Sequence, residues 1–331
     1  MTKNKTMDEW MDEYLFYCKS RQLRPKTLQS YEQGLFLFER WAREKQDITE
    51  AGKVTDTVIR HYIVDVQERG KYTVCVNDYA ANYNHPERRR DYRAKVSNVT
   101  VNGYIRVLRA FFNWLELEGV VSKNPMERIK QLKTDRKARE FLTDEEFTRL
   151  CRCMDLSYFS EQRDHMVITL ILDTGMRLGE CLVLKTEDLD LKNRAILLRE
   201  DNTKGRKART VFFSKKAQLL LRKWLRYKDR YCESEFLFPK HDGTVIHLSS
   251  FEKNFRMYLN RAGIDKPLTP HCLRNNFAKR CLMNGMDIYT LSRILGHSSV
   301  TVTEAAYLDL NDEDIRQRYQ HFSPLEAMGR G

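Results

Sequence analysis

A ten-residue stretch with almost no apolar side chains, at positions 131–140, divides this chain into two parts. It reads QLKTDRKARE, and a segment so polar and basic is typical of a linker between folded domains. Directly after it, Thr143 and Glu146 have the spacing of a helix capping box, which indicates the start of a new folded unit. With 331 residues, the chain is long enough to form two hydrophobic cores. We therefore predict domains at 1–130 and 141–331, joined by this basic linker.

The first domain is predicted to be helical, because its apolar residues recur every three or four positions. Thr6 and Glu9 form a possible capping box before the first helix. A second helix is expected from about Thr27. The pattern predicts a third helix from Thr55 to Gly70 and a fourth from about Thr100, ending before Gly119.

A polar stretch at about 71–97 separates the third and fourth predicted helices. It is too long for an ordinary connection and contains the basic run His85-Pro-Glu-Arg-Arg-Arg90. Two interpretations remain open for this insertion, a solvated surface loop or a segment that reaches toward an anion. The plain loop is slightly favoured, since runs of charge are usually solvated.

The second domain combines helices with a small β-hairpin. Two short β-prone runs, Ala195–Leu198 and Thr210–Phe213, flank a polar turn that contains glycine, so we expect Lys204 near the tip of a hairpin. A buried helix is expected at 161–173, ending near Thr174-Gly175. The fold class is therefore mainly α with a small β-sheet (α+β). Further helices are expected at about 215–230, 248–262, 270–284, 287–295 and 301–321.

Charge and composition limit the class of protein. The chain has 58 Lys and Arg against 46 Asp and Glu, and the net charge of +12 favours a polyanionic partner, although soluble basic proteins without one are at least as common. No apolar run approaches the roughly 18 residues that span a bilayer. The N-terminus is acidic where a signal peptide is apolar, so we predict a cytoplasmic protein without a membrane partner. Its eight scattered cysteines are expected to be reduced, with no metal site.

Polar residues in five stretches of the second domain could serve one phosphate. Arg177 lies at an expected helix start, where backbone amides and the helix dipole favour anions, and Glu180 on the same face could hold its guanidinium. His271 and Arg274 are three residues apart on one helix face, so both can meet one phosphate. The other members of this set are Lys204, His297 and Tyr307. Taken singly, each residue of the set has an ordinary structural explanation.

Together, these residues form a specific pattern. An arginine, a lysine, His-x-x-Arg, a histidine and a tyrosine follow in this order, within TGMRLGE, HCLRNNFA and LGHSSVTVTEAAY. The pattern resembles the catalytic signature of the tyrosine recombinases, the phage-integrase family of DNA site-specific recombinases. The resemblance covers roughly residues 6–323 and is strongest from 140 onward. It implies a helical core DNA-binding domain at 1–130 and a catalytic domain at 141–331.

The resemblance also implies how the scissile phosphate is bound. Arg177 and Arg274 would bind its non-bridging oxygens and stabilise the charge of a pentavalent transition state. His297 would hydrogen-bond the phosphate, and Glu180 would support the arrangement.

It further implies which groups attack and protonate. Tyr307 would attack the phosphorus, leaving a 3′-phosphotyrosyl link and a free 5′ hydroxyl. His271 would assist proton transfer at this nucleophile, and Lys204 would protonate the departing oxygen, with Lys207 as a competitor for that role. His297 and Tyr307 are ten residues apart, one more than the commonest spacing in the family.

The implied partners are a double-stranded DNA recombination site and three further copies of the chain. Four protomers act on two duplexes through a Holliday junction, and the C-terminal tail near 311–325 docks on a neighbouring protomer, unless it is an ordinary terminal helix. No cofactor or metal is expected, since the tyrosyl ester retains the bond energy. DNA contacts are expected at Arg136, Lys137, Arg139 and Lys207.

Two other classes of function remain open at this point. One is a related enzyme, a type IB topoisomerase or a telomere resolvase, and the other is a DNA-binding protein without catalysis. The sequence does not distinguish the resolution of host chromosomes from the integration or excision of a transposon or other mobile element. It also does not identify the DNA site or any accessory protein.

Overall fold

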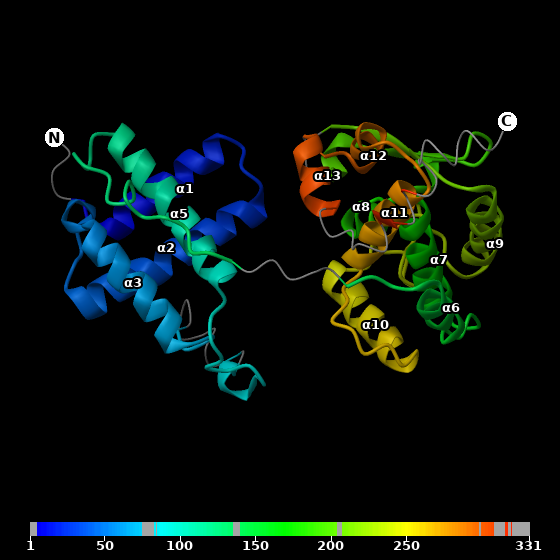
Figure 1. Cartoon of the computed structure of the whole chain (residues 1–331), viewed down its shortest axis with the longest axis horizontal. Coiled ribbons are helices and arrows are strands. Elements are labelled where there is room, and N and C mark those ends of the chain that lie inside the picture. Colours follow the sequence, from blue (N-terminus) through cyan, green and yellow to red (C-terminus); the bar gives the residue numbers. More distant parts are fainter. Residues whose placement is uncertain are drawn as a thin grey trace. The chain divides into compact units, whose positions relative to one another are not determined.

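The computed structural model describes residues 5–74, 83, 85–134, 140–203, 207–297, 299–307, 315, 316 and 319, apart from the side chains of residues 302 and 305–307. The chain divides into two compact units, Met1–Arg136 and Lys137–Gly331 (Figure 1). The division falls inside the basic stretch 131–140. Each unit has a hydrophobic core of its own.

Unit 1, Met1–Arg136, is helical, and the apolar stripes of its helices meet in one core. Thr55 caps the third helix by accepting a hydrogen bond from the Val58 amide, and Gly70 ends it, as predicted. Buried aromatic side chains from each of the long helices fill the core. These helices are α1 (Met7–Ser20), α2 (Pro25–Gln46), α3 (Asp56–Arg69) and α5 (Asn98–Leu117), with short 3-10 helices at Ala51–Lys53 and Pro86–Arg88.

The described part of the 71–97 insertion is closed at its base by two backbone hydrogen bonds. The Lys71 amide donates to the Ala94 carbonyl at 2.9 Å, and the Arg93 amide donates to the Lys71 carbonyl at 3.0 Å. The Arg89 guanidinium lies 4.2 Å from the centre of the Tyr72 ring. These contacts define the base of the segment, and both interpretations of its role remain predictions.

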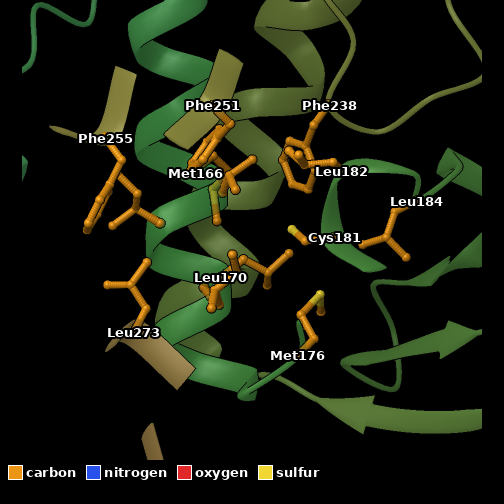
Figure 2. Close-up of a cluster of buried hydrophobic side chains, with 14 of the residues drawn as sticks. Met166, Leu170, Met176, Cys181, Leu182, Leu184, Phe238, Phe251, Phe255 and Leu273 are labelled. Carbon is orange, nitrogen blue, oxygen red and sulfur yellow. The ribbon is translucent and has the colours of Figure 1, made fainter. Parts of the chain in front are cut away.

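The core of unit 2, Lys137–Gly331, forms around the buried helix α7 (Phe159–Thr174). Met166 of α7 lies among buried side chains of α8 (Leu178–Leu182) and α10 (Leu248–Arg261), as Figure 2 shows. The capping box at Thr143 is present as predicted. The remaining helices are α6 (Asp144–Arg152), α9 (Lys215–Tyr231), α11 (His271–Met283), α12 (Ile288–Leu295) and α13 (Val300–Tyr307), with 3-10 helices at Thr186–Asp188 and Glu200–Asn202.

A small antiparallel sheet with the order β1-β2-β3 lies in unit 2. The strands are β1 (Leu189–Asp190), β2 (Ala195–Leu198) and β3 (Arg209–Phe212), and Leu198 pairs with Arg209. The hairpin was predicted, but its second strand begins one residue earlier than expected, and β1 was not foreseen. Residues 204–206 of the connecting turn lie outside the described part of the chain.

Within the described ranges, no helix is long and apolar enough to cross a membrane. The cysteines that the structure describes are all free thiols, and Cys75 lies outside those ranges. Of the helix expected at 301–321, α13 forms the first part. Beyond Tyr307 only residues 315, 316 and 319 are described, and they are helical.

Candidate active site

Arg177 is placed by the turn between α7 and α8. α7 ends at Gly175, whose φ of +67° lets the chain reverse direction. α8 then starts directly after Arg177 and is fixed by Cys181 and Leu182, which lie in the buried cluster of Figure 2. The Arg177 guanidinium donates to Glu180 Oε1 at 2.9 Å, and its backbone amide donates to Oε2 at 2.9 Å. Glu180 therefore holds Arg177 as the spacing predicted.

Glu180 is buried and accepts hydrogen bonds from a second arginine. Arg209 donates to Oε1 at 3.0 Å and to Oε2 at 2.6 Å in a bidentate pair. Burial alone would raise the pKa of the Glu180 carboxyl, but the bonds from Arg209 and Arg177 outweigh it, so the pKa lies below its ordinary value. Glu180 is thus a carboxylate between two guanidinium groups.

Arg209 is the site residue that the sequence reasoning missed. It is the first residue of β3, far from Glu180 along the chain, and no local motif links the two. The available signal was a cation directly before the strand predicted at Thr210–Phe213, and this does not identify Glu180 as its partner. Its Nε also donates to the Ile294 carbonyl at 3.2 Å.

Arg274 lies on α11 and is almost completely buried. Its guanidinium donates to the carbonyl of Gly175 at 2.7 Å and to the carbonyl of Leu295 at 2.7 Å. It also contacts His297 Nε2 at 2.9 Å. Two tight backbone bonds therefore fix the orientation of this cation before any ligand arrives.

His297 follows Gly296, which ends α12 in the left-handed conformation with a φ of +63°. Because a guanidinium can only donate, His297 Nε2 accepts from Arg274 and carries no proton. The proton then lies on Nδ1, which contacts Thr303 Oγ1 at 2.7 Å. Burial, followed by the charges of Arg274, Arg177, Arg209 and His271, lowers the His297 pKa to about 4. The ring is therefore neutral at pH 7.

Thr303 connects this turn to α13, which ends at Tyr307. It is fully buried and lies one helical turn before Tyr307. The helix that carries Tyr307 is consequently tied to the His297 ring. The Tyr307 side chain itself lies outside the described part of the structure, so its orientation toward the arginines remains a prediction.

The other predicted site residues differ in what the structure describes. His271 is the exposed first residue of α11, close enough to His297 for its charge to lower the His297 pKa. Lys207 is exposed next to β3. Four predicted residues lie outside the described ranges: Lys204, Arg136, Lys137 and Arg139.

Three guanidinium groups converge on the C-terminal end of α12. Arg209 bonds the Ile294 carbonyl, Arg274 the Leu295 carbonyl, and Arg177 lies 3.5 Å from the Gly296 carbonyl. The last carbonyls of a helix have no partners within it and carry partial negative charge, which these cations satisfy. The resulting cluster of positive charge, with a neutral histidine beside it, suits a phosphate that gains negative charge during a reaction.

Matches to known proteins extend over both units of the chain. The model of the Phage integrase family matches residues 140–314. Tyrosine recombinase XerD of Listeria monocytogenes is 26% identical over 325 residues, which is 96% of this chain and 99% of the relative. Tyrosine recombinase XerC of Oceanobacillus iheyensis is 30% identical over 239 residues, covering 70% of this chain and 77% of the relative.

A solved structure shares the fold. The Tn1549 transposon integrase in complex with a circular intermediate DNA gives a TM-score of 0.72 at 18% identity, covering 97% of this chain and 100% of that one.

Proposed function

Because this chain belongs to the phage integrase family and is a site-specific DNA recombinase, we propose that it cuts each strand through Tyr307. The observation that carries this mechanism is the fixed guanidinium pair of Arg177 and Arg274 around the end of α12. A topoisomerase, a telomere resolvase or a silent DNA-binding protein is not favoured, since the relatives are named as tyrosine recombinases.

In the proposed cleavage step, the Tyr307 oxygen forms a bond to the phosphorus and the bond to the 5′ oxygen breaks. The phenol proton passes toward His271, and Lys204 supplies a proton to the departing 5′ oxygen. Arg177 and Arg274 stabilise the charge on the non-bridging oxygens. Attack of a 5′ hydroxyl on the phosphotyrosyl ester reverses these steps and rejoins the strand, so no external energy source is needed.

His297 is proposed to act first on Arg274 and then on the phosphate. Its Nε2 accepts from the Arg274 guanidinium in this structure, so the ring helps to orient that cation. To donate a hydrogen bond to a phosphate from Nε2, the ring has to move its proton from Nδ1 or take up a second one. The negative charge that the phosphate oxygens gain in the transition state favours that change.

Further proposals concern partners and setting. We propose that four protomers assemble on two duplexes, which mass measurement of the synaptic complex tests. We also propose that residues 311–325 dock on a neighbouring protomer. Arg136, Lys137, Arg139 and Lys207 are proposed to contact the DNA backbone, and the basic composition of the linker supports the first three. We propose a cytoplasmic location, which a DNA substrate supports. Repeats in the DNA that flanks the gene would support a role in a mobile element.

The mechanism is tested with a nicked suicide duplex that carries the recombination site. The wild-type chain should form a covalent adduct, Tyr307→Phe should form none, and Tyr289→Phe, which changes an exposed tyrosine on α12, should react normally. Arg177→Ala or Arg274→Ala should slow cleavage by about 100-fold or more, since each removes a donor to the transition state. An adduct with Tyr307→Phe, or unchanged rates in both arginine variants, would contradict the assigned roles.

A further inference from the structure

Arg209 contacts both Glu180, which also binds Arg177, and the C-terminal end of α12, where the Leu295 carbonyl binds Arg274. Its two terminal nitrogens donate hydrogen bonds to the Glu180 carboxylate, and its Nε donates to the Ile294 carbonyl. All three of its nitrogens are engaged in these contacts, and its side chain is only 12% exposed. Arg209 is therefore placed to hold other groups rather than to bind a phosphate itself.

Through Glu180, Arg209 acts on Arg177. The carboxylate is buried and balanced by two cations. Without Arg209, Arg177 would be the remaining cation bonded to this carboxylate. A buried charge that loses one partner is costly, so its attraction for the other partner becomes stronger. The Arg177 guanidinium would then be drawn more firmly onto Glu180 and away from a ligand.

Through α12, Arg209 acts on His297. A Cβ atom built on Gly296 would lie 2.8 Å from Arg209 Cδ and 2.9 Å from its Nε, so the turn before His297 closes directly over this side chain. Gly296 is needed both for its backbone conformation and for this close approach. A shift of Arg209 therefore moves the turn that orients His297.

We propose that Arg209 is a positioning residue for strand cleavage: it sets Arg177 through Glu180 and sets His297 through the end of α12. This inference rests on the proposed phosphoryl-transfer function and assigns a role to a residue that the known signature does not include. The competing explanation is that Arg209 and Glu180 form an ordinary buried ion pair that only stabilises the fold.

Arg209→Lys separates the two explanations, because it keeps the positive charge but loses the planar fork. Arg163→Lys is the matched control. Arg163 is a more deeply buried arginine of the same unit, with its guanidinium bonded to Asp164 and to the Pro239 carbonyl. Its hydrogen bonds reach none of the residues of the proposed site that the structure describes. Arg209→Gln and Glu180→Gln serve as second variants if the lysine variant is unstable.

Three quantities are measured for each full-length variant: the melting temperature, the DNA affinity, and the rate of adduct formation on the suicide duplex with saturating protein. We expect Arg209→Lys to slow cleavage by about 100-fold, the effect of misplacing a catalytic group by an ångström, with DNA affinity unchanged. Arg163→Lys should lower the melting temperature but cleave at the wild-type rate. In an Arg177→Ala background, Arg209→Lys should add much less than its effect alone, because the two act as one unit.

The outcomes distinguish this inference from the proposed function. A wild-type chain that forms no adduct, or a Tyr307→Phe variant that does, overturns the function and the inference with it. A reactive wild type whose Arg209→Lys and Arg209→Gln variants cleave normally overturns the inference alone. The same holds if the Arg209 variants slow cleavage only in proportion to the fraction of the protein that is unfolded.

Discussion

Replacing Gly175 by alanine should damage the candidate site through the backbone. Gly175 ends α7 in the left-handed region, and its carbonyl accepts a bond from Arg274. A Cβ atom there would lie 2.3 Å from Phe277 Cδ1 and 3.0 Å from Leu295 Cδ2. Phe277 is packed against the small cluster that includes Leu282 and Leu295, so the ring has little freedom to move.

The cost of Gly175→Ala has two parts that a control separates. A left-handed backbone costs an alanine roughly 1–2 kcal/mol. Overpacking against Phe277 adds about 1–3 kcal/mol. Gly263 has nearly the same φ, +65°, but a Cβ atom added to it would meet nothing within 4 Å, so Gly263→Ala should show the first cost without the second.

Thermal unfolding of the full chain, followed by circular dichroism, measures the difference. For a domain of this size each kcal/mol lowers the melting temperature by about 2–4 °C, so Gly175→Ala should melt roughly 2–12 °C below Gly263→Ala. Adduct formation on the suicide duplex should also be slower, because the displaced carbonyl no longer fixes Arg274. If the two alanine variants melt together and cleave at the same rate, the steric argument is refuted.

Two further predictions address the histidine and the hairpin. NMR titration should give His297 a pKa of about 4, against 6.5 for a free imidazole. Because the ring binds a proton at higher pH in the unfolded chain, the contribution of His297 to the free energy of unfolding should fall as pH drops from about 6.5 to 4 and stay constant above about pH 6.5. Thr203→Val should slow cleavage, since Thr203 Oγ1 accepts from the Lys207 amide at 3.1 Å and contacts the Lys207 carbonyl at 3.0 Å, fixing both ends of the turn that contains Lys204. A 5′-thiolate leaving group needs no general acid, so the Thr203→Val variant should cleave such a substrate at the wild-type rate if the turn positions Lys204 for protonation. Equally slow cleavage of both substrates would contradict that role.

Local chemistry explains what could be predicted from the sequence. Thr55, Thr143 and Gly175 each cap the helix directly next to them in the sequence, so their capping roles can be inferred without knowing the tertiary fold. The pairing of Arg177 with Glu180 belongs to the same class, since three residues of helix bring the two together. The hairpin was found for similar reasons, with an error of one residue in β3.

Contacts between distant segments explain what could not be predicted. The partners of Arg274 are the carbonyls of Gly175 and Leu295, and backbone acceptors leave no mark in side-chain composition. Arg209 reaches Glu180 only because the tertiary fold brings these two distant segments together, a relation that no periodicity encodes. Lys228 is a similar case, a buried lysine whose ammonium contacts the Ser234 carbonyl.

The end of α12 gives a physical reason for the order of residues in Leu295-Gly296-His297. A helix that stops there exposes its last carbonyls, and those carbonyls bind Arg209 and the two arginines proposed to bind the phosphate, Arg177 and Arg274. Glycine permits the stop and leaves room for Arg209, and the histidine that follows is placed directly beside Arg274. The proposed anion site is therefore organised by a helix C-terminus, which is the unfavourable end for an anion. An anion can bind there only because the arginines reverse the sign of the charge that it meets.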